Sequence, residues 1–462
     1  MMTNTNRFLV IGPLFAFATY YLCIAAFGFQ QDAAITAGIT VLTVIWWVSE
    51  ALPIPITSLL PFALLPLFGI LSHREVSSAF GSHVILLLMG AFMLSKTLER
   101  AGVHKRLALM MVNAIGAHSK KRLVFGFMLA TAALSMWISN TATILIMLPI
   151  ALAVLSQIQE RTLKVAMILG IAYSASVGGL GTLIGTPPNV IFAGLYEQQT
   201  GNEFSFVTWM MVGIPVVVIA IPMMALWLIR RLKGPLQIDL PVLGHWQVEE
   251  VRTLLVFGLA VLAWITRNEP FGGWSDLFDI PMAGDSTVAL AAVIIMFMVP
   301  NGKGERLLDW KTAVDIPWGM LLLFAGGIAL AKGFTASGLS QLIGDGLSAF
   351  TEFPLLITLL LLCLTVTYLT EITSNVATAT LLMPILYLVG INYGVDPAIF
   401  MVPAAMAASC AFMLPVATAP NAIAYGTGEI EIREMVKEGA VLSFAVSSML
   451  ALVSYVLLGL LL

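Results

Sequence analysis

Charged residues are scarce in this chain, and their scarcity excludes most classes of soluble protein. Only 10% of the 462 residues are Asp, Glu, Lys or Arg, whereas 59% are hydrophobic, and the mean hydropathy is +0.97. A soluble domain carries about 25% charged residues, because it must cover itself with a wetted surface. The composition therefore predicts a protein whose solvent is lipid, and the net charge of −3 adds little to this.

Cysteine and histidine are also few. The three cysteines, Cys23, Cys363 and Cys410, lie in apolar runs without a C-x-x-C spacing, so we interpret them as small packing residues. The five histidines show no H-E-x-x-H or similar pairing, and no nucleophile–base set is visible in the apolar runs. The sequence thus supports neither an enzyme nor a bound metal of the His/Cys type.

Long apolar runs are what the chain has instead. Many reach the roughly 20 residues that a helix needs to cross a hydrocarbon core, and they are continuous rather than alternating, which excludes a β-barrel. We expect an all-α polytopic membrane protein with about 11 transmembrane helices. The run 8–29 is too long for the apolar part of a signal peptide, so it is predicted to be a helix within an N-terminal segment 1–32. The other expected spans are 33–51, 54–71, 83–101, 163–197, 205–230, 252–266, 285–300, 316–334, 397–427 and 438–462.

Two further apolar segments, about 122–157 and 354–394, are interrupted at their middles by Ser-Asn. Each is long enough to cross twice or to enter and return as a re-entrant hairpin. With the N-terminus in the cytoplasm, either choice leaves most Lys and Arg on the cytoplasmic side, in agreement with the positive-inside rule. The polar tips favour hairpins that stop midway. We therefore expect a multi-pass protein of the bacterial inner membrane, with a cytoplasmic N-terminus and a periplasmic C-terminus.

The chain contains an internal repeat. Ser139-Asn140-Thr141-Ala142-Thr143 recurs as Ser374-Asn375-Val376-Ala377-Thr378, and Gly185-Thr186-Pro187-Pro188-Asn189 recurs as Ala417-Thr418-Ala419-Pro420-Asn421, in the same order and at nearly the same spacing. One unit runs over 33–231, with its hairpin at about 122–157 and a broken helix at about 163–197. The other runs over 252–462, with its hairpin at about 354–394 and a broken helix at about 397–427. An odd number of crossings in each unit inverts the second copy, which is a recurring design of secondary transporters.

The interruptions supply the chemistry of a binding site. Irregular backbone within a membrane is tolerated only where protein or water satisfies it. Each interruption opens a new half-helix, and helix N-termini present free N–H groups to an anion. The carbonyl ends of the preceding half-helices, with Ser hydroxyl and Asn amide oxygens, suit a sodium ion, and we expect one such ion per unit. No Lys or Arg lies in these motifs, so sodium must balance the charge of the anion, and we expect the shared pocket to contain no carboxylate.

Two features remain open at this point. The amphipathic stretches 103–119 and 338–350 are predicted to lie along the two membrane surfaces, or to be simple connecting helices. Glu371 is the one acid near a Ser-Asn tip, and Met136 takes its place in the first unit. An ionisable group in a membrane segment is a functional candidate. A helix-terminus role or a pore-lining role is favoured over a proton relay.

Taken together, the paired Ser-Asn-Thr tips and the T-x-P-N breaks resemble those of the divalent anion/sodium symporter family, and in particular the bacterial INDY-type sodium/dicarboxylate cotransporters. The resemblance covers nearly the whole chain. It implies a homodimer that works as an elevator, in which the hairpins and broken helices move against the remaining helices. It also implies sodium-driven uptake of C4-dicarboxylates such as succinate, malate and fumarate.

The resemblance also implies site residues. The first sodium site would use Ser135, Ser139, Asn140 and Gly185, with Ser135 contributing a carbonyl. The second would use Thr370, Thr373, Asn375 and Ala417. The substrate would meet Asn140, Thr141, Thr186, Pro187, Asn375, Val376, Thr418 and Ala419.

One residue departs from the family pattern. Val376 stands where the family usually has Thr, which removes a hydroxyl from the second tip and disfavours bulkier polar substrates such as citrate. The main alternative is a sodium-coupled carrier of another anion, such as citrate or sulfate. A membrane-embedded enzyme would need a reactive group that the sequence lacks, and a channel would conduct without sodium-dependent accumulation.

Overall fold

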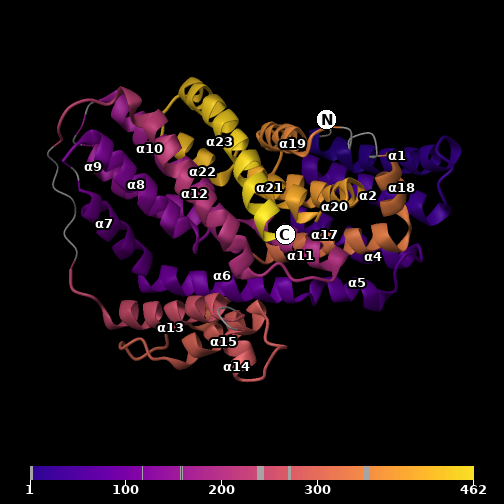
Figure 1. Cartoon of the computed structure of the whole chain (residues 1–462), viewed down its shortest axis with the longest axis horizontal. Helices are drawn as coiled ribbons and strands as arrows, with labels where there is room; N and C mark the ends of the chain where they lie inside the picture. Colours follow the sequence, from indigo (N-terminus) through magenta and orange to yellow (C-terminus); the bar gives the residue numbers. More distant parts are fainter. Residues whose placement is uncertain are drawn as a thin grey trace.

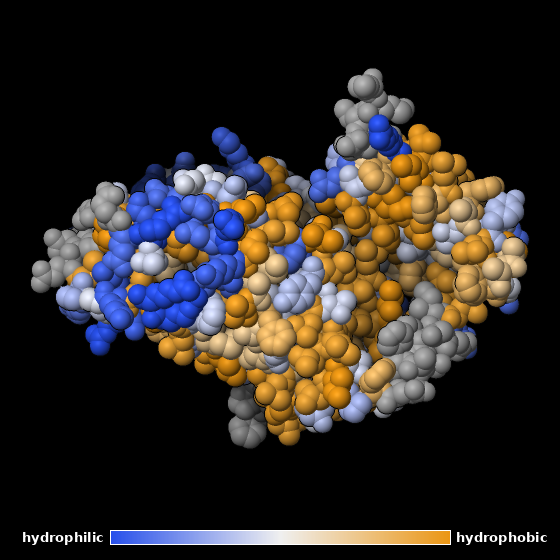
Figure 2. Space-filling view, turned by 90° about the horizontal axis from the view of Figure 1, so that it is seen from above, coloured by the Kyte–Doolittle hydropathy of each residue, from blue (hydrophilic) through white to orange (hydrophobic). Residues whose placement is uncertain are grey.

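The computed structural model describes residues 4–116, 118–156, 158, 160–236, 244–268, 272–346 and 353–462. Within these ranges the chain is built of helices, and the only β pairing is in isolated bridges. The predicted all-α class is therefore confirmed. By length and composition, eight of the described helices suit a membrane crossing, and shorter apolar helices accompany them. The face seen in Figure 2 is mostly hydrophobic, and its largest group of hydrophilic residues lies toward one end.

The first 231 residues fold into helices that follow the sequence pattern closely. The helices are α1 (Asn4–Ala25), α2 (Gln31–Ser49), α3 (Ile54–Thr57), α4 (Leu60–Leu67), α5 (His73–Phe80), α6 (His83–Ala101), α7 (Val103–Ile115), α8 (Lys120–Ser135), α9 (Asn140–Leu155), α10 (Arg161–Gly178), η1 (Gly179–Gly181), α11 (Pro187–Thr200), α12 (Phe206–Leu228) and η2 (Ile229–Arg231). The expected span 54–71 is helical over most of its length, but it is divided into two short helices, α3 and α4. Pro61 lies in the first turn of α4 and has no N–H with which to continue α3.

The later part of the chain repeats this order. Its helices are α13 (Val248–Ile265), α14 (Gly273–Leu277), α15 (Asp285–Met298), α16 (Trp310–Ala313), α17 (Trp318–Ala336), α18 (Leu339–Gly346), α19 (Leu355–Thr370), α20 (Asn375–Tyr393), α21 (Ala398–Ala408), α22 (Ala419–Gly426) and α23 (Ile432–Leu461). The two amphipathic stretches form α7 and α18, and residues 347–350 of the second stretch lie outside the described residues.

Both Ser-Asn tips are turns between two helices. Residues 136–139 join α8 to α9, and residues 371–374 join α19 to α20. Ser139 precedes the first residue of α9 and its side chain accepts a hydrogen bond from the backbone N–H of Ala142, so it acts as a capping residue. The structure brings the two hairpins to opposite sides of a central group formed by α10, α12, α21, α22 and α23 (Figure 1).

The two units are interleaved rather than side by side. Helix α10 packs against α22 as well as against α8, and α12 packs against α23. Three ion pairs join the units near the ends of these helices: Arg161 Nη2 to Glu434 Oε2 at 2.7 Å, Lys164 Nζ to Glu429 Oε2 at 2.9 Å, and Arg230 Nη2 to Glu438 Oε2 at 2.7 Å. The interruptions of both units therefore lie within one packed body.

Candidate functional site

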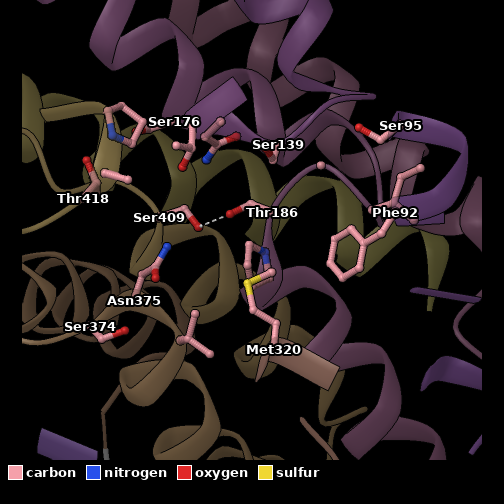
Figure 3. A pocket seen from close by; sticks show the side chains of 18 of the residues that line it. Phe92, Ser95, Ser139, Ser176, Thr186, Met320, Ser374, Asn375, Ser409 and Thr418 are labelled. Carbon is pink, nitrogen blue, oxygen red and sulfur yellow. Dashed lines mark hydrogen bonds between the residues drawn. The ribbon is translucent and has the colours of Figure 1, made fainter. Parts of the chain in front are cut away.

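A cavity of about 370 Å³ lies where four half-helices begin. Helices α9 and α11 come from the first unit and α20 and α22 from the second, and the first residues of each line the cavity. Figure 3 shows side chains from both units around it, with Ser139 and Ser176 facing Asn375 and Ser409 across the space. The volume falls in the range of about 300–1,000 Å³ that small-molecule pockets occupy.

Most of the predicted site residues line this cavity, although they come from segments far apart in the sequence. The predicted residues in its wall are Ser139, Asn140, Thr141, Gly185, Thr186, Pro187, Asn375, Val376, Ala417, Thr418 and Ala419. Ser135, Thr370 and Thr373 lie behind the wall instead. Ser135 and Thr370 are fully buried.

Oxygen atoms converge beside the first tip. The Oγ of Ser135 lies 2.7 Å from the Oδ1 of Asn140 and 2.6 Å from the carbonyl oxygen of Ala175. The same Asn140 atom lies 3.0 Å from the carbonyl oxygen of Ala175 and 3.3 Å from that of Gly185. An oxygen of the Asn140 side chain cannot hydrogen-bond to carbonyl oxygens, which are acceptors as well. If the amide oxygen and nitrogen of Asn140 exchange places, the nitrogen can donate to them. With the amide swapped, the Nδ2 of Asn140 donates to Ser135 Oγ and to the carbonyl oxygens of Ala175 and Gly185, so these three oxygens surround one side chain at the first tip.

The second tip repeats part of this arrangement. The Oγ1 of Thr370 donates to the carbonyl oxygen of Ala408 at 3.0 Å, in the place of the Ser135–Ala175 contact. The Oγ1 of Thr373 lies 2.9 Å from the carbonyl oxygen of Leu369 and 2.6 Å from the Oγ1 of Thr378. In Figure 3 the side chain of Asn375 extends from the start of α20 toward the cavity. This cluster is richer in hydroxyl groups than the first.

Two buried asparagines hold the breaks open, and the sequence analysis treated them only as part of the repeated motif. The Nδ2 of Asn189 donates to the carbonyl oxygens of Gly179 and Thr182 at 2.9 and 2.8 Å. The Nδ2 of Asn421 donates to those of Ala411 and Leu414 at 3.0 and 3.1 Å. Unpaired backbone carbonyls are costly in a membrane. These two side chains therefore make an interrupted backbone possible at both breaks, and their recurrence in the repeat was the available signal.

Glu371 has a helix-terminus role in this structure. It is buried at the end of α19, and its carboxylate accepts hydrogen bonds from the backbone N–H groups of Phe412, Met413 and Leu414, at 2.7 to 3.1 Å. Those N–H groups belong to the second break. The carboxylate thus fixes the backbone that leads to α22, and it does not line the cavity.

The expectation of a pocket without a carboxylate is wrong, because Glu50 lies in its wall. Glu50 follows the last residue of α2 in a left-handed conformation with φ of 48°. The sequence analysis did not assign Glu50 to the pocket, because this residue lies at the end of an apolar span that contains none of the repeated motifs. Other lining residues that the sequence analysis missed include Phe92, Ser95, Trp137, Ser176, Met320 and Ser409.

The cavity presents helix termini, and no cationic side chains, to whatever enters it. None of its lining residues is Lys or Arg. Four N-termini, each with a partial positive charge, point toward the same space. Free N–H groups are fewer at α11, which begins with Pro187 and Pro188 and whose Asn189 N–H bonds to the carbonyl oxygen of Thr186. The hydroxyl groups of Thr186 and Ser409 lie 3.3 Å apart between them and join the first unit to the second.

Apolar helices in two repeated units, with interrupted helices that meet at a polar pocket, are the architecture of a secondary membrane transporter. The chain belongs to the citrate transporter family, whose family model matches residues 44–397. This places it where the resemblance in its motifs pointed, among multi-pass transporters.

The curated relatives agree with this placement. The chain is 40% identical to the sodium-dependent dicarboxylate transporter SdcS of Staphylococcus saprophyticus, over 93% of this chain and 87% of the relative. It is 39% identical to SdcS of Staphylococcus aureus, over 97% of this chain and 90% of the relative. Among solved structures, the YdaH transporter of Alcanivorax borkumensis is similar with a TM-score of 0.52 and 17% identity, over 84% of this chain and 87% of that one, which supports the fold.

Proposed function

We propose that this protein is a secondary active transporter that couples sodium ions to the uptake of C4-dicarboxylates such as succinate, malate and fumarate. The observation that carries the proposal is the convergence of four half-helix N-termini on one cavity without Lys or Arg, with buried hydroxyl groups of Ser135 and Thr370 behind two of them. The names of the relatives support both the ion and the class of substrate.

The geometry suggests how the ion and the substrate are coupled. A sodium ion beside Asn140, held by Ser135, Ser139 and Gly185, would lie behind the N-terminus of α9. A second, beside Asn375, Thr370, Thr373 and Ala417, would lie behind that of α20. Each ion would bring a full positive charge close to one carboxylate of the substrate. Because the wall offers Glu50 and no cationic side chain, binding of the dianion without sodium is unfavourable.

The substrate would span the two tips. One carboxylate would meet Asn140, Thr141 and Thr186, and the other Asn375 and Thr418, with Pro187, Val376 and Ala419 forming the apolar wall. Val376 offers no hydroxyl where a third carboxylate would need a donor. We therefore propose C4-dicarboxylates as better substrates than citrate, although the family is named for citrate. We also propose them as better substrates than sulfate, which is too small to contact both tips.

We further propose an elevator motion within a homodimer, in a bacterial inner membrane with the N-terminus in the cytoplasm. The ion pairs of Arg161, Lys164 and Arg230 support a single moving body, because they tie α10 and η2 of the first unit to α23 and the segment before it in the second.

The test is uptake of labelled succinate into proteoliposomes with a gradient of sodium, of potassium or of pH as the only driving force. We expect accumulation with sodium alone, competition by malate and fumarate, and weak competition by citrate and sulfate. Asn140→Ala and Asn375→Ala should abolish uptake, whereas Asn113→Ala, at an exposed position on α7, should not. Uptake driven equally by potassium, or by neither cation, would overturn the proposal.

A further inference from the structure

A second cavity, of about 160 Å³, lies away from the transport pocket, where α10 and α23 begin and α12 ends. Its wall is rich in basic side chains. The charged residues that line it are Arg161, Arg230, Arg231, Lys437, Glu434 and Glu438. The hydrophilic end of the molecule in Figure 2 is the end at which α10 and α23 begin in Figure 1 (left in both views).

The acids in this wall do not balance its bases. Glu434 pairs with Arg161 at 2.7 Å, and Arg161 also lies 3.4 Å from Glu431 outside the wall. Glu438 is shared between Arg230 at 2.7 Å and Arg231 at 3.7 Å. Lys437 makes no ion pair with any residue that the structure describes. The cavity therefore keeps an excess of positive charge, carried by the exposed side chains of Arg231 and Lys437.

An open apolar groove adjoins this basic cavity. The groove has a volume of about 640 Å³ and runs between α12 and α23. Its lining is apolar except for Arg230, which it shares with the basic cavity: Ile219, Pro222, Met223, Leu226, Trp227, Val441, Leu442 and Ala445. Leu226 leaves 69% of its surface exposed, so the groove has no covering partner within the described chain.

Arg230 marks the border between the two cavities. Its guanidinium carbon lies 3.7 Å from the centre of the Trp227 ring, and the ion pair with Glu438 holds it from the other side. Tryptophan is enriched at the level of lipid headgroups, because its ring is amphipathic. A basic pocket that opens onto an apolar groove at this level has the shape and charge of a phospholipid rather than of a free anion.

We propose that this composite site binds an anionic phospholipid of the phosphatidylglycerol type. The phosphate would lie in the basic cavity near Arg231 and Lys437, and one acyl chain would lie in the groove between α12 and α23. A zwitterionic lipid would place its own ammonium against the excess positive charge. A free phosphate would leave the groove unused. The lipid would bridge a helix of each unit and therefore rest on the body that carries the transport pocket.

The headgroup is tested by native mass spectrometry of delipidated full-length protein, titrated with phosphatidylglycerol or with phosphatidylethanolamine of the same acyl chains. Each basic side chain near a membrane surface contributes roughly fivefold in affinity for anionic lipid. Lys437→Gln with Arg231→Gln should therefore weaken phosphatidylglycerol binding by more than about tenfold and leave phosphatidylethanolamine unchanged. Arg433→Gln is the matched control, because Arg433 is exposed on the same helix but outside both cavities.

The groove is tested separately. Ala445→Trp should fill it and weaken phosphatidylglycerol binding, while glycerol phosphate, which has the headgroup chemistry without the chain, should not displace the lipid at millimolar concentration. Equal binding of the two lipids, or a preference that survives the Lys437 and Arg231 changes, would overturn the proposal. Displacement by glycerol phosphate or inorganic phosphate would also overturn it, since the site would then be a plain anion site.

Discussion

Gly185 is the residue whose replacement tests the first sodium site most directly. A methyl group added at Gly185 would lie 2.4 Å from the carbonyl oxygen of Gly179, closer than the 3.0 Å below which real Cβ contacts are essentially absent. Gly179 cannot yield easily, because its carbonyl oxygen accepts a hydrogen bond from the Nδ2 of buried Asn189 at 2.9 Å. Gly185→Ala must therefore move backbone that belongs to the oxygen cluster.

The size of the effect follows from these distances. Relief of the contact needs a shift of about 0.6 Å, which exceeds the roughly 0.5 Å within which a binding constellation must be held. Misplacement on the scale of 1 Å can cost about 100-fold in function. We expect Gly185→Ala to raise the sodium concentration for half-maximal uptake at least about tenfold. The second cluster already has Ala417 in the equivalent place, so it should keep its affinity.

The assay is sodium-dependent succinate uptake in proteoliposomes, with protein amount and monodispersity checked in detergent. Gly258→Ala is the control, because a methyl group there, on α13, would have no neighbour within 4 Å. It should transport like the parent protein. If Gly185→Ala folds and keeps the parent's sodium dependence, the oxygen cluster beside Asn140 is not a sodium site.

Three further changes have defined outcomes. Val376→Thr should add a hydroxyl to the pocket wall and lower the KM for succinate, since a hydrogen bond contributes about 0.5–1.5 kcal/mol; an unchanged KM in uptake assays would place the carboxylate elsewhere. Glu371→Gln should leave the N–H of Leu414 without an acceptor and lower the free energy of unfolding by roughly 1–3 kcal/mol, measured by thermal unfolding. Uptake by this variant should still be driven by sodium. If the parent protein shows proton-driven uptake and only this variant loses it, Glu371 is a proton relay. Arg267→Met should cost about 3–5 kcal/mol, because it leaves the buried Asp285 carboxylate without its partner at 3.1 Å; a parent-like Tm would contradict this.

Much of the site could be predicted because its motifs occur once in each of the two repeated units. Pro188 and Pro420 indicate breaks in helices, and capping residues such as Ser139 mark where the next helix begins. Comparison of the two copies then separated these positions from ordinary Ser and Pro. The same comparison placed Asn140 and Asn375 on one cavity, since both occupy the first residue of a half-helix.

The rest depended on tertiary packing that no local pattern encodes. Glu50 reaches the pocket only because α2 ends there, and the residues after it contain no repeated motif. The exact backbone contact between Gly179 and Gly185 follows from how the first break folds back on itself. The division of the span 54–71 into α3 and α4 at Pro61 is likewise a detail that its apolar composition does not show.

The interleaving of the two units has a consequence for how such a protein could have arisen. A chain of one unit would supply two of the four helix starts and one oxygen cluster, and it would leave the opposite wall of the cavity open. It could complete the cavity only by pairing with another copy of itself, in the way α10 now packs on α22. Once two such copies are fused into one polypeptide, a mutation can alter the sequence of one unit without altering the other. The differences between Gly185 and Ala417, and between Met136 and Glu371, are changes that a symmetric pair could not have made.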